Sequence, residues 1–251
     1  MSELVRHERR RGLDVATLDS PQNRNALSLQ LLDELATVVE RSAGDDSRGL
    51  LLDHTGDVFC AGVDLRERRE RADDPGAHSR LLGRLLTALW GYPKPLLCRV
   101  GGACRGGGMG LVACSDVVVA EPAATFAYSE VRVGVAPALV SALALQKVPL
   151  GALLPVLVTG DVFDAEAAGR IGLVTAVGGA AALDASIAAV AAAAPNAVQT
   201  TKALARRVAG TVDVRALVAE MEEISAQLFA GEEAAEGMAA FAEKRPPAWA
   251  S

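Results

Sequence analysis

Apolar runs of strand length alternate with amphipathic helical patterns along most of the chain before residue 178. The runs predict strands at Leu4–His7, Leu13–Leu18, Gly49–Asp53, Leu96–Val100, Val117–Ala120 and Leu173–Val177. Because predicted strands and helices follow one another in turn, the pattern indicates an α/β fold.

Two of the helices are marked by leucine and valine at a spacing that places these side chains on one helix face. The first runs from Leu31 to Val39 and follows Ser28, a residue type that caps helix N-termini well. The second runs from Leu81 to Leu89 and follows an acidic turn, Asp73–Gly76. We expect both helices to bury their apolar faces.

The pattern becomes wholly helical after Gly178 and Gly179. The alanine-rich stretch Ala180–Ala194 predicts one helix, and Pro195 predicts the start of another, since proline suits the first helical turn. The chain therefore divides into a core, residues 1–194, and a C-terminal helical region, residues 195–251.

Composition is that of a globular protein, with 251 residues, 51% hydrophobic and 22% charged. A net charge of -6 argues against a nucleic-acid partner. No apolar run follows the arginines near the N-terminus, and no uncharged stretch of about 18 residues indicates a membrane span. We expect a cytoplasmic protein with no membrane partner.

The four cysteines and three histidines are scattered without the spacing of a metal site or a disulfide framework. We therefore expect no metal, and we expect Cys60 and Cys104 to be buried as small apolar residues. The glycine and serine motifs of dinucleotide-binding proteins, P-loop proteins and α/β-hydrolases are also missing from the sequence.

Three consecutive glycines, Gly106–Gly108, precede an apolar segment that suits a helix. Glycine has no Cβ, so the main chain can approach a ligand closely there. A helix that begins at Gly107 or Gly108 would point its unpaired amides toward a negative charge on the ligand. Glu130 follows further along and could move a proton. The same glycines would also suit a tight turn that binds nothing.

A second glycine turn lies upstream, where an apolar strand leads into Ala61-Gly62-Val63-Asp64. The order and spacing of the two turns, together with Ser129-Glu130-Val131 and Thr159-Gly160, resemble the enoyl-CoA hydratase/isomerase (crotonase) superfamily. The resemblance extends roughly from Leu13 to Lys244. It implies a spiral of β-β-α turns with a helical C-terminal part.

The resemblance also implies residue roles. The amides of Val63 and Gly107 would hold the thioester oxygen, and Glu130 would carry the proton. The remaining substrate-binding residues that it implies are Ala26, Ala61, Gly62, Asp64, Arg66, Gly106, Gly110, Phe241 and Lys244. Coenzyme A would enter as part of an acyl-CoA substrate, so no separate cofactor is expected.

Arg66 could reach a phosphate of coenzyme A, since many relatives carry lysine at this position. A solvated helix face is the alternative for Arg66. We expect such a face for its basic neighbours Arg68, Arg69 and Arg71, which are interspersed with Glu67 and Glu70.

The chain departs from the best-known hydratases at Gly110, where those enzymes carry a first glutamate. Water addition needs one group to take a proton from water and one to deliver a proton to the α-carbon, a division that two carboxyls perform naturally. Moving a double bond from the 3 to the 2 position needs one base. On chemistry alone, Gly110 with Glu130 favours an isomerase.

A finer resemblance favours a hydratase. The segments from Gly110 to Asp116 and from Ser129 to Ser141 are similar to hydratases of the methylglutaconyl-CoA type, which act on branched or carboxylated enoyl thioesters. Three hypotheses stay open at this point: a hydratase, which we favour, an isomerase, and an acyl-CoA binder that has lost turnover.

Residues 195–251 resemble the family's assembly region, which implies a homotrimer or a hexamer. Phe241 and Lys244 match a family pair that reaches the coenzyme A of a neighbouring subunit. The alternative is a solvated terminal helix with one apolar anchor.

Overall fold

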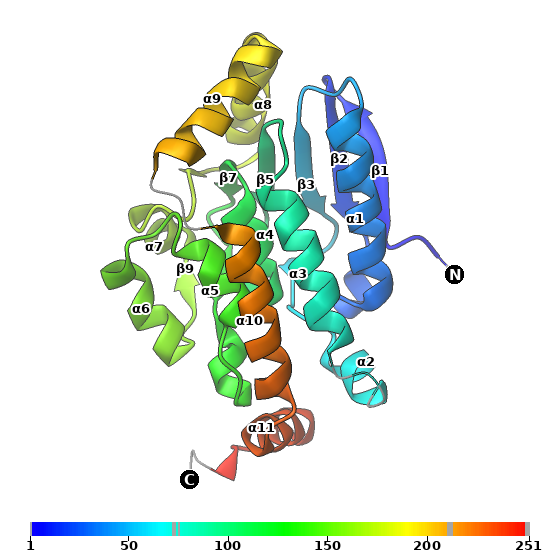
Figure 1. Cartoon of the computed structure of the whole chain (residues 1–251), viewed down its shortest axis with the longest axis vertical. Coiled ribbons are helices and arrows are strands. Elements are labelled where there is room, and N and C mark those ends of the chain that lie inside the picture. The colour runs from blue at the N-terminus through cyan, green and yellow to red at the C-terminus, as the bar shows by residue number, and fades with distance from the viewer. Residues whose placement is uncertain (1, 72–73, 75, 210–212, 249–251) are drawn as a thin grey trace.

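The strands form two separate sheets in the computed structural model, which describes residues 2–71, 74, 76–209 and 213–248. The six-stranded sheet contains, in spatial order, β1 (Val5–Arg10), β2 (Leu13–Leu18), β3 (Leu50–His54), β5 (Leu96–Val100), β7 (Val117–Ala120) and β10 (Ala176–Val177). The four-stranded sheet contains, in spatial order, β4 (Val58–Cys60), β6 (Ala103–Arg105), β8 (Thr125–Ala127) and β9 (Phe163–Asp164). Figure 1 shows the larger sheet behind its helices.

Parallel pairing dominates both sheets. Only β1 with β2 and β8 with β9 pair antiparallel, while the other neighbours run parallel. Successive strands go first to the large sheet and then to the small one, as in β3 then β4, β5 then β6, and β7 then β8. Each pair is followed by helical structure. The predicted α/β spiral of β-β-α turns is thus confirmed.

Three predicted strands, β2, β5 and β7, are confirmed residue for residue, and β1 and β3 are shifted slightly. The prediction for Leu173–Val177 is wrong in its first part. The amides of Leu173 and Val174 both donate to the carbonyl of Ala168, which closes the end of a helix instead of extending a strand.

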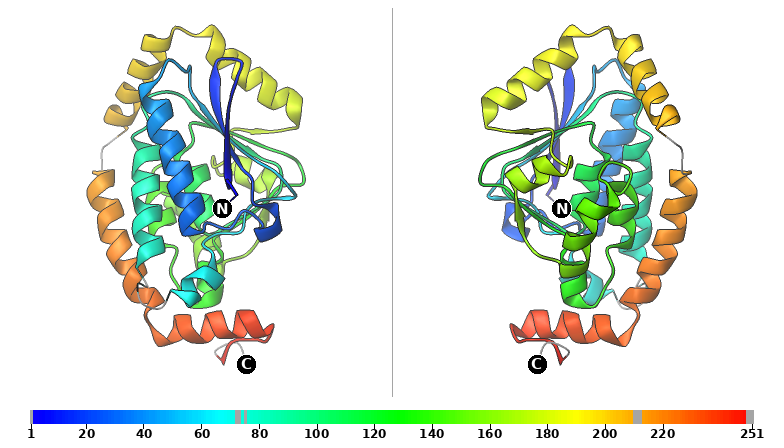
Figure 2. Two further views of the ribbon diagram at one scale, coloured as in Figure 1. Left: turned by 90° about the vertical axis from the view of Figure 1, so that its right-hand side faces the viewer. Right: turned by 90° about the vertical axis from the view of Figure 1, so that its left-hand side faces the viewer.

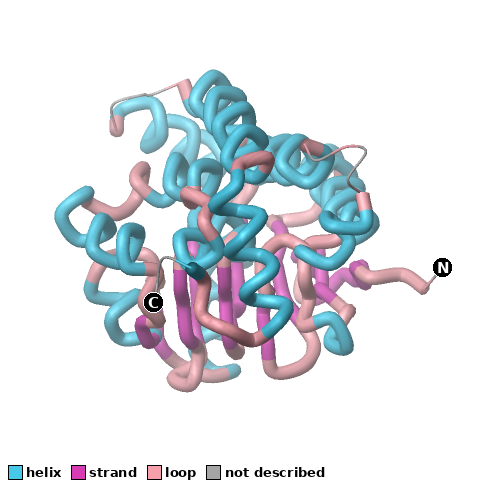
Figure 3. The backbone as a smooth tube through the Cα atoms, turned by 90° about the horizontal axis from the view of Figure 1, so that it is seen from below, coloured by secondary structure: helices cyan, strands magenta, loops and turns pink. Residues whose placement is uncertain are grey.

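The central strands are buried on both faces, because side chains alternate between the two sides of a sheet. On β2, Leu13 and Val15 belong to a small apolar cluster, whereas Ala16 and Leu18 belong to the main core. Helix α8 (Ala180–Ala192) covers the small cluster with Leu183 and Ile187. In Figure 3 most of the other helices lie together on one side of the strands.

Three long helices lie side by side over the main core: α1 (Leu29–Gly44), α3 (Ala77–Trp90) and α10 (Val214–Phe229), with α3 in the middle (Figure 2). Ser28 caps α1 as predicted, since its hydroxyl accepts from the Leu31 amide. The apolar face predicted for α3 is confirmed by the burial of Leu82, Leu85, Leu86 and Leu89. In the predicted acidic turn, Asp73 and Pro75 lie outside the described residues.

The remaining helices complete the core and the C-terminal region. They are α2 (Leu65–Glu70), α4 (Gly107–Cys114), α5 (Ala138–Ala144), α6 (Leu150–Thr159), α7 (Ala165–Arg170), α9 (Pro195–Val208) and α11 (Glu232–Glu243), with short 3-10 helices at Pro21–Asn23 and Ser129–Val133. The predicted starts at Gly107 and Pro195 are confirmed. Helix α11 lies across the end of α10 (Figure 2).

None of the described helices is by itself long and apolar enough to cross a bilayer. Helices α8 and α9 together have the length and apolar composition of a span, but the chain bends by 105° between them.

Candidate active site

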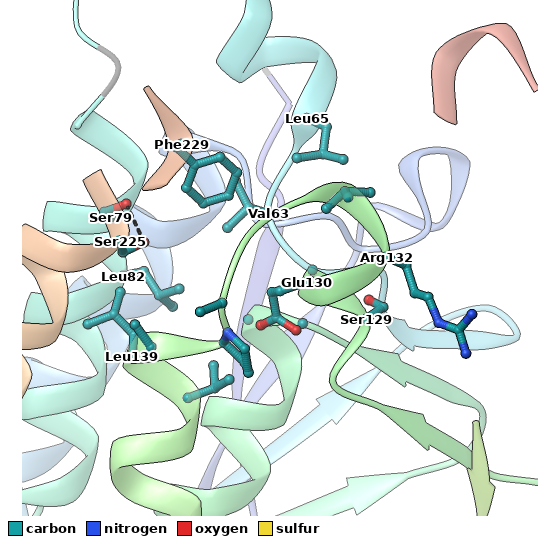
Figure 4. A pocket seen from close by; sticks show the side chains of 18 of the residues that line it. Val63, Leu65, Ser79, Leu82, Ser129, Glu130, Arg132, Leu139, Ser225 and Phe229 are labelled. Atoms are coloured by element: carbon teal, nitrogen blue, oxygen red, sulfur yellow. Dashed lines mark hydrogen bonds between the residues drawn. The ribbon is translucent and has the colours of Figure 1, made fainter. Parts of the chain in front are cut away.

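A cavity of about 200 Å³ lies between the two glycine turns, the Ser129–Val133 segment and the helices α3, α5 and α10. Apolar side chains make up much of its wall, including Val63, Leu65, Leu82, Leu139 and Phe229. Figure 4 shows these side chains around the carboxyl group of Glu130, which lies near the centre of the view. The cavity therefore combines an apolar wall with one ionisable group, which is typical of a small-molecule site.

The two glycine turns meet at the cavity. A Cβ built on Gly106 would lie 3.5 Å from the Cα of Gly62, so the two backbones are in van der Waals contact. Gly62 has a φ of 91° and Gly106 a φ of 48°, in the left-handed region that glycine adopts without strain. Both glycines are therefore needed for conformation as well as for close approach.

Each turn contains one backbone amide without a hydrogen-bond partner among the described residues. Val63 forms a parallel bridge with Leu27 in which the neighbouring Gly62 carbonyl and Asp64 amide make the hydrogen bonds. Its own amide is left unpaired among the described residues. Gly107 is the first residue of α4, so its amide has no partner within the helix. Both residues line the cavity. Two unpaired amides close together are the kind of arrangement that can stabilise a developing negative charge.

Glu130 lies opposite the turn at Gly106. Its Oε1 atom would be 3.6 Å from a Cβ at that glycine. Its Oε2 atom is buried and has no hydrogen-bond partner among the described residues. Burial raises the pKa of the Glu130 carboxyl to about 7, and hydrogen bonding from its own amide opposes the shift. A carboxyl with this pKa can both accept and donate a proton near neutral pH.

Gly110, predicted as a substrate-binding residue, does not line the cavity. It lies inside α4, where an added Cβ would be 2.8 Å from Leu86 Cδ2 and 3.2 Å from Val140 Cγ1. The side chains of α3 and α5 therefore occupy the space that a carboxyl at this position would need. Of the described residues that line the cavity, Glu130 is the one acid.

The structure brings together Ala61, Gly62, Val63, Gly106, Gly107, Glu130 and Phe241 of the predicted residues. It leaves Ala26, Asp64, Arg66 and Lys244 away from the cavity wall. Asp64 caps α2 by accepting from the amides of Arg66 and Glu67. Arg66 is 90% exposed in its side chain and pairs with Glu70, so the structure favours the solvated alternative for this residue in the isolated chain.

Phe241 lines the cavity of its own chain. Its helix, α11, packs tightly on the Ser129–Val133 segment, because a Cβ on Gly237 would lie 2.4 Å from the carbonyl carbon of Val133. Lys244 caps the C-terminus of this helix in the left-handed conformation and does not line the cavity.

The prediction of a solvated face is wrong for Arg68. Its residue exposure is 6%, and its guanidinium carbon lies 3.6 Å from the centroid of the Phe229 ring. Sequence reasoning also missed Ser79, Ser225 and Phe229, which line the cavity from α3 and α10. Helix α10 begins far along the chain, and no local motif places it beside the glycine turns.

Comparison with known proteins agrees with this geometry. A sequence model described as "Enoyl-CoA hydratase/isomerase" matches residues 8–251. The mevalonyl-coenzyme A hydratase of Aspergillus fumigatus is 33% identical over 93% of this chain and 89% of its own length. A Thermus thermophilus protein that bears an enoyl-CoA hydratase name is 35% identical over 65% of this chain, and the match spans 66% of that protein. The crystal structure of an enoyl-CoA hydratase from Mycobacterium avium superposes with a TM-score of 0.87 at 35% identity, covering 99% of this chain and 100% of that one.

Proposed function

Because the chain belongs to the enoyl-CoA hydratase/isomerase family, we propose that it is a hydratase that adds water reversibly to a 2-enoyl-CoA thioester. The observation that carries the proposal is the position of Glu130, whose buried carboxyl faces the two glycine turns. The hydratase names of the Aspergillus fumigatus and Thermus thermophilus relatives are the reason for placing hydration before isomerisation in this proposal.

The proposed reaction begins with the thioester oxygen between the amides of Val63 and Gly107. Glu130 takes a proton from a water molecule while the hydroxyl adds to the β-carbon, and the electrons of the double bond move onto the thioester oxygen as an enolate. The two amides stabilise this negative charge. Glu130 then gives its proton to the α-carbon, which restores the thioester and the ionised carboxylate.

One carboxyl thus performs both proton transfers, and its raised pKa suits both. A carboxyl with the usual pKa of a glutamate is a weak base toward water. A carboxyl with a pKa of about 7, such as that of Glu130, accepts and donates a proton at similar free-energy cost near neutral pH. The apolar wall around Glu130 is therefore part of the proposed mechanism, because it raises the pKa.

Isomerisation is the second candidate, and the single acid on the cavity wall favours it. Glu130 alone could remove an α-proton from a 3-enoyl thioester and return it at the γ-carbon. The same two amides would hold the enolate. Hydration and isomerisation would therefore use the same residues of this site and would differ in whether a water molecule takes part in the reaction.

A panel of 2-enoyl-, 3-enoyl- and methylglutaconyl-CoA thioesters separates the candidates. We expect a 2-enoyl substrate to lose its conjugated absorbance and to gain the mass of one water molecule. New conjugation at unchanged mass from the 3-enoyl substrate would support an isomerase instead. No change with any thioester, combined with tight binding, would support a binder without turnover.

The pH dependence of kcat/KM is a further prediction. The proposed reaction starts from the ionised form of Glu130, so kcat/KM should rise with pH, with an inflection at about 7, and level off above it. Stopped-flow assays across this range check the prediction. An inflection near the usual pKa of a solvated glutamate would show that burial does not tune this group.

We propose that the protein assembles as a homotrimer or a hexamer, and one apolar row supports assembly. Leu150, Leu154 and Val158 follow one face of α6 and are 58%, 45% and 63% exposed. Contiguous apolar surface of this kind marks interaction sites. This row lies in residues 1–194, outside the C-terminal region that the sequence favoured for assembly. Leu204 and Phe241 are the large apolar side chains exposed in the described part of that region.

Multi-angle light scattering should give a multiple of the 25.9 kDa chain mass. Leu154→Lys should dissociate the assembly, because it places a charge in the α6 row. Leu204→Lys, the same change on α9, is the matched control and should leave the mass unchanged. A monomeric wild-type protein would contradict the proposal. Dissociation by Leu204→Lys but not by Leu154→Lys would show that the interface lies in the C-terminal region and not at the α6 row.

A further inference from the structure

Two buried cysteines that the proposed reaction does not use lie beside the glycine turns. Cys60 ends β4, and Cys104 is its parallel partner on β6 in the small sheet. Both are fully buried, as the sequence predicts. Gly62 comes two residues after Cys60, and Gly106 comes two residues after Cys104. Each glycine turn therefore follows a buried thiol at the same distance along the chain.

The side chain of Cys60 contacts both turns. The amide of Gly62 donates to its Sγ atom across 3.4 Å. On the other turn, a Cβ built on Gly108 would lie 2.7 Å from the Cys60 Cβ and 3.0 Å from its Sγ, so the first turn of α4 packs directly on this side chain. Gly62 precedes Val63, and Gly108 follows Gly107. One cysteine thus contacts a neighbour of each amide that would bind the thioester oxygen.

The Cys60 thiol is neutral in this position. Burial raises its pKa to about 12, and hydrogen bonding from the amides of Gly62 and Gly108 opposes the shift. The group is therefore protonated at neutral pH. A neutral sulfur is a weak acceptor for an amide, and it adds no negative charge that would repel a developing enolate.

We propose that Cys60 is a positioning residue for the reaction, because its sulfur fixes the separation of the two glycine turns. That separation aims the amides of Val63 and Gly107 at one point. The ladder between β4 and β6 shifts register between Val58 and Cys60, so regular strand pairing does not set the distance between the turns. The inference rests on the proposed function, since it requires a thioester oxygen between the two amides.

The first test is kinetic. Cys60→Ala removes the acceptor and should lower kcat for a 2-enoyl-CoA by about tenfold, the upper end of what one neutral hydrogen bond contributes. KM should change little, because Cys60 does not line the cavity. Cys60→Ser restores an acceptor for the amide two residues further on, and kcat should return to within about threefold of the wild-type value.

Cys98→Ala is the matched control. Cys98 is a fully buried cysteine of the same core, but it lies on β5 in the large sheet and does not line the cavity. Both alanine variants lose a buried sulfur, so their thermal unfolding temperatures should fall by similar amounts. Only Cys60→Ala should lose kcat. An equal loss of kcat in the two variants would show that a loosened core lowers activity, and it would overturn the inference.

Infrared difference spectroscopy gives a second test that needs no turnover. The probe is butyryl-CoA, a saturated thioester, with an isotope label at the carbonyl carbon. Hydrogen bonds from the two amides should shift its carbonyl stretch to lower frequency on binding. The shift should be smaller in Cys60→Ala and of wild-type size in Cys60→Ser and Cys98→Ala.

The spectra also separate this inference from the proposed function. A full wild-type shift in Cys60→Ala would overturn the inference and leave the proposed reaction standing. A shift that depends on Cys60, in a protein that hydrates no thioester, would support the inference and contradict the proposed reaction. The absence of any shift in the wild-type protein would overturn both.

Discussion

Glu130→Gln is expected to lower kcat by about 10²- to 10⁴-fold, the range that a positioned acid or base contributes. Glutamine keeps the size of the side chain and much of its hydrogen bonding, but it cannot take a proton from water. Because Glu130 acts on the proton and not on the coenzyme A moiety, the affinity for an acyl-CoA should change little. The measurements are steady-state kinetics with a 2-enoyl-CoA and calorimetric binding of its saturated analogue.

Glu40→Gln is the matched control for this change, since Glu40 is exposed on α1 and lies outside the cavity. It should leave kcat and affinity unchanged. Full activity in Glu130→Gln would mean that the proton travels through another residue, and the proposed mechanism would then be wrong for both hydration and isomerisation.

Gly107→Val should lower turnover by at least about 100-fold, the scale of losing one oxyanion-hole donor. A Cβ at this position would lie 2.7 Å from Leu27 Cδ1 and 3.2 Å from Leu82 Cδ2. We expect the added side chain to press against these two buried leucines, to occupy space at the thioester site and to disturb the direction of the Gly107 amide. Because the substitution weakens a hydrogen-bond donor to the developing oxyanion, we expect the loss of activity to appear in kcat.

The control for Gly107→Val is Gly44→Val, because Gly44 ends α1 and has no atom within 4 Å of its would-be Cβ. Circular dichroism and thermal unfolding establish that both variants are folded. A folded Gly107→Val protein with wild-type turnover would remove this amide from the site.

The sequence predicted most of what depends on local pattern. Strands buried on both faces, such as β2 and β5, are continuous apolar runs, and Ser28 marks the start of α1 by cap chemistry alone. The turns at Gly62 and Gly106 were predictable because their conformations require glycine. The second sheet was not predicted, since β4, β6 and β8 have three residues each and carry too little periodicity.

The contact between α2 and α10 beside the cavity could not be predicted from the local sequence pattern. Arg68 is in a run of alternating charges that is typical of a solvated helix, yet it is buried and contacts Phe229, more than 150 residues away in sequence. Likewise, the raised pKa of Glu130 depends on apolar residues from several separate helices. The glutamate could be located from the sequence, but its pKa could not.

The most direct test of the account is a crystal structure with a bound 2-enoyl-CoA analogue. We expect the thioester oxygen within about 3 Å of the amide nitrogens of both Val63 and Gly107, the usual length of such a hydrogen bond. The α-carbon should lie beside the Glu130 carboxyl, with room for one water molecule at the β-carbon. A thioester bound away from these two amides, or a Glu130 carboxyl out of reach of both carbons, would contradict the account.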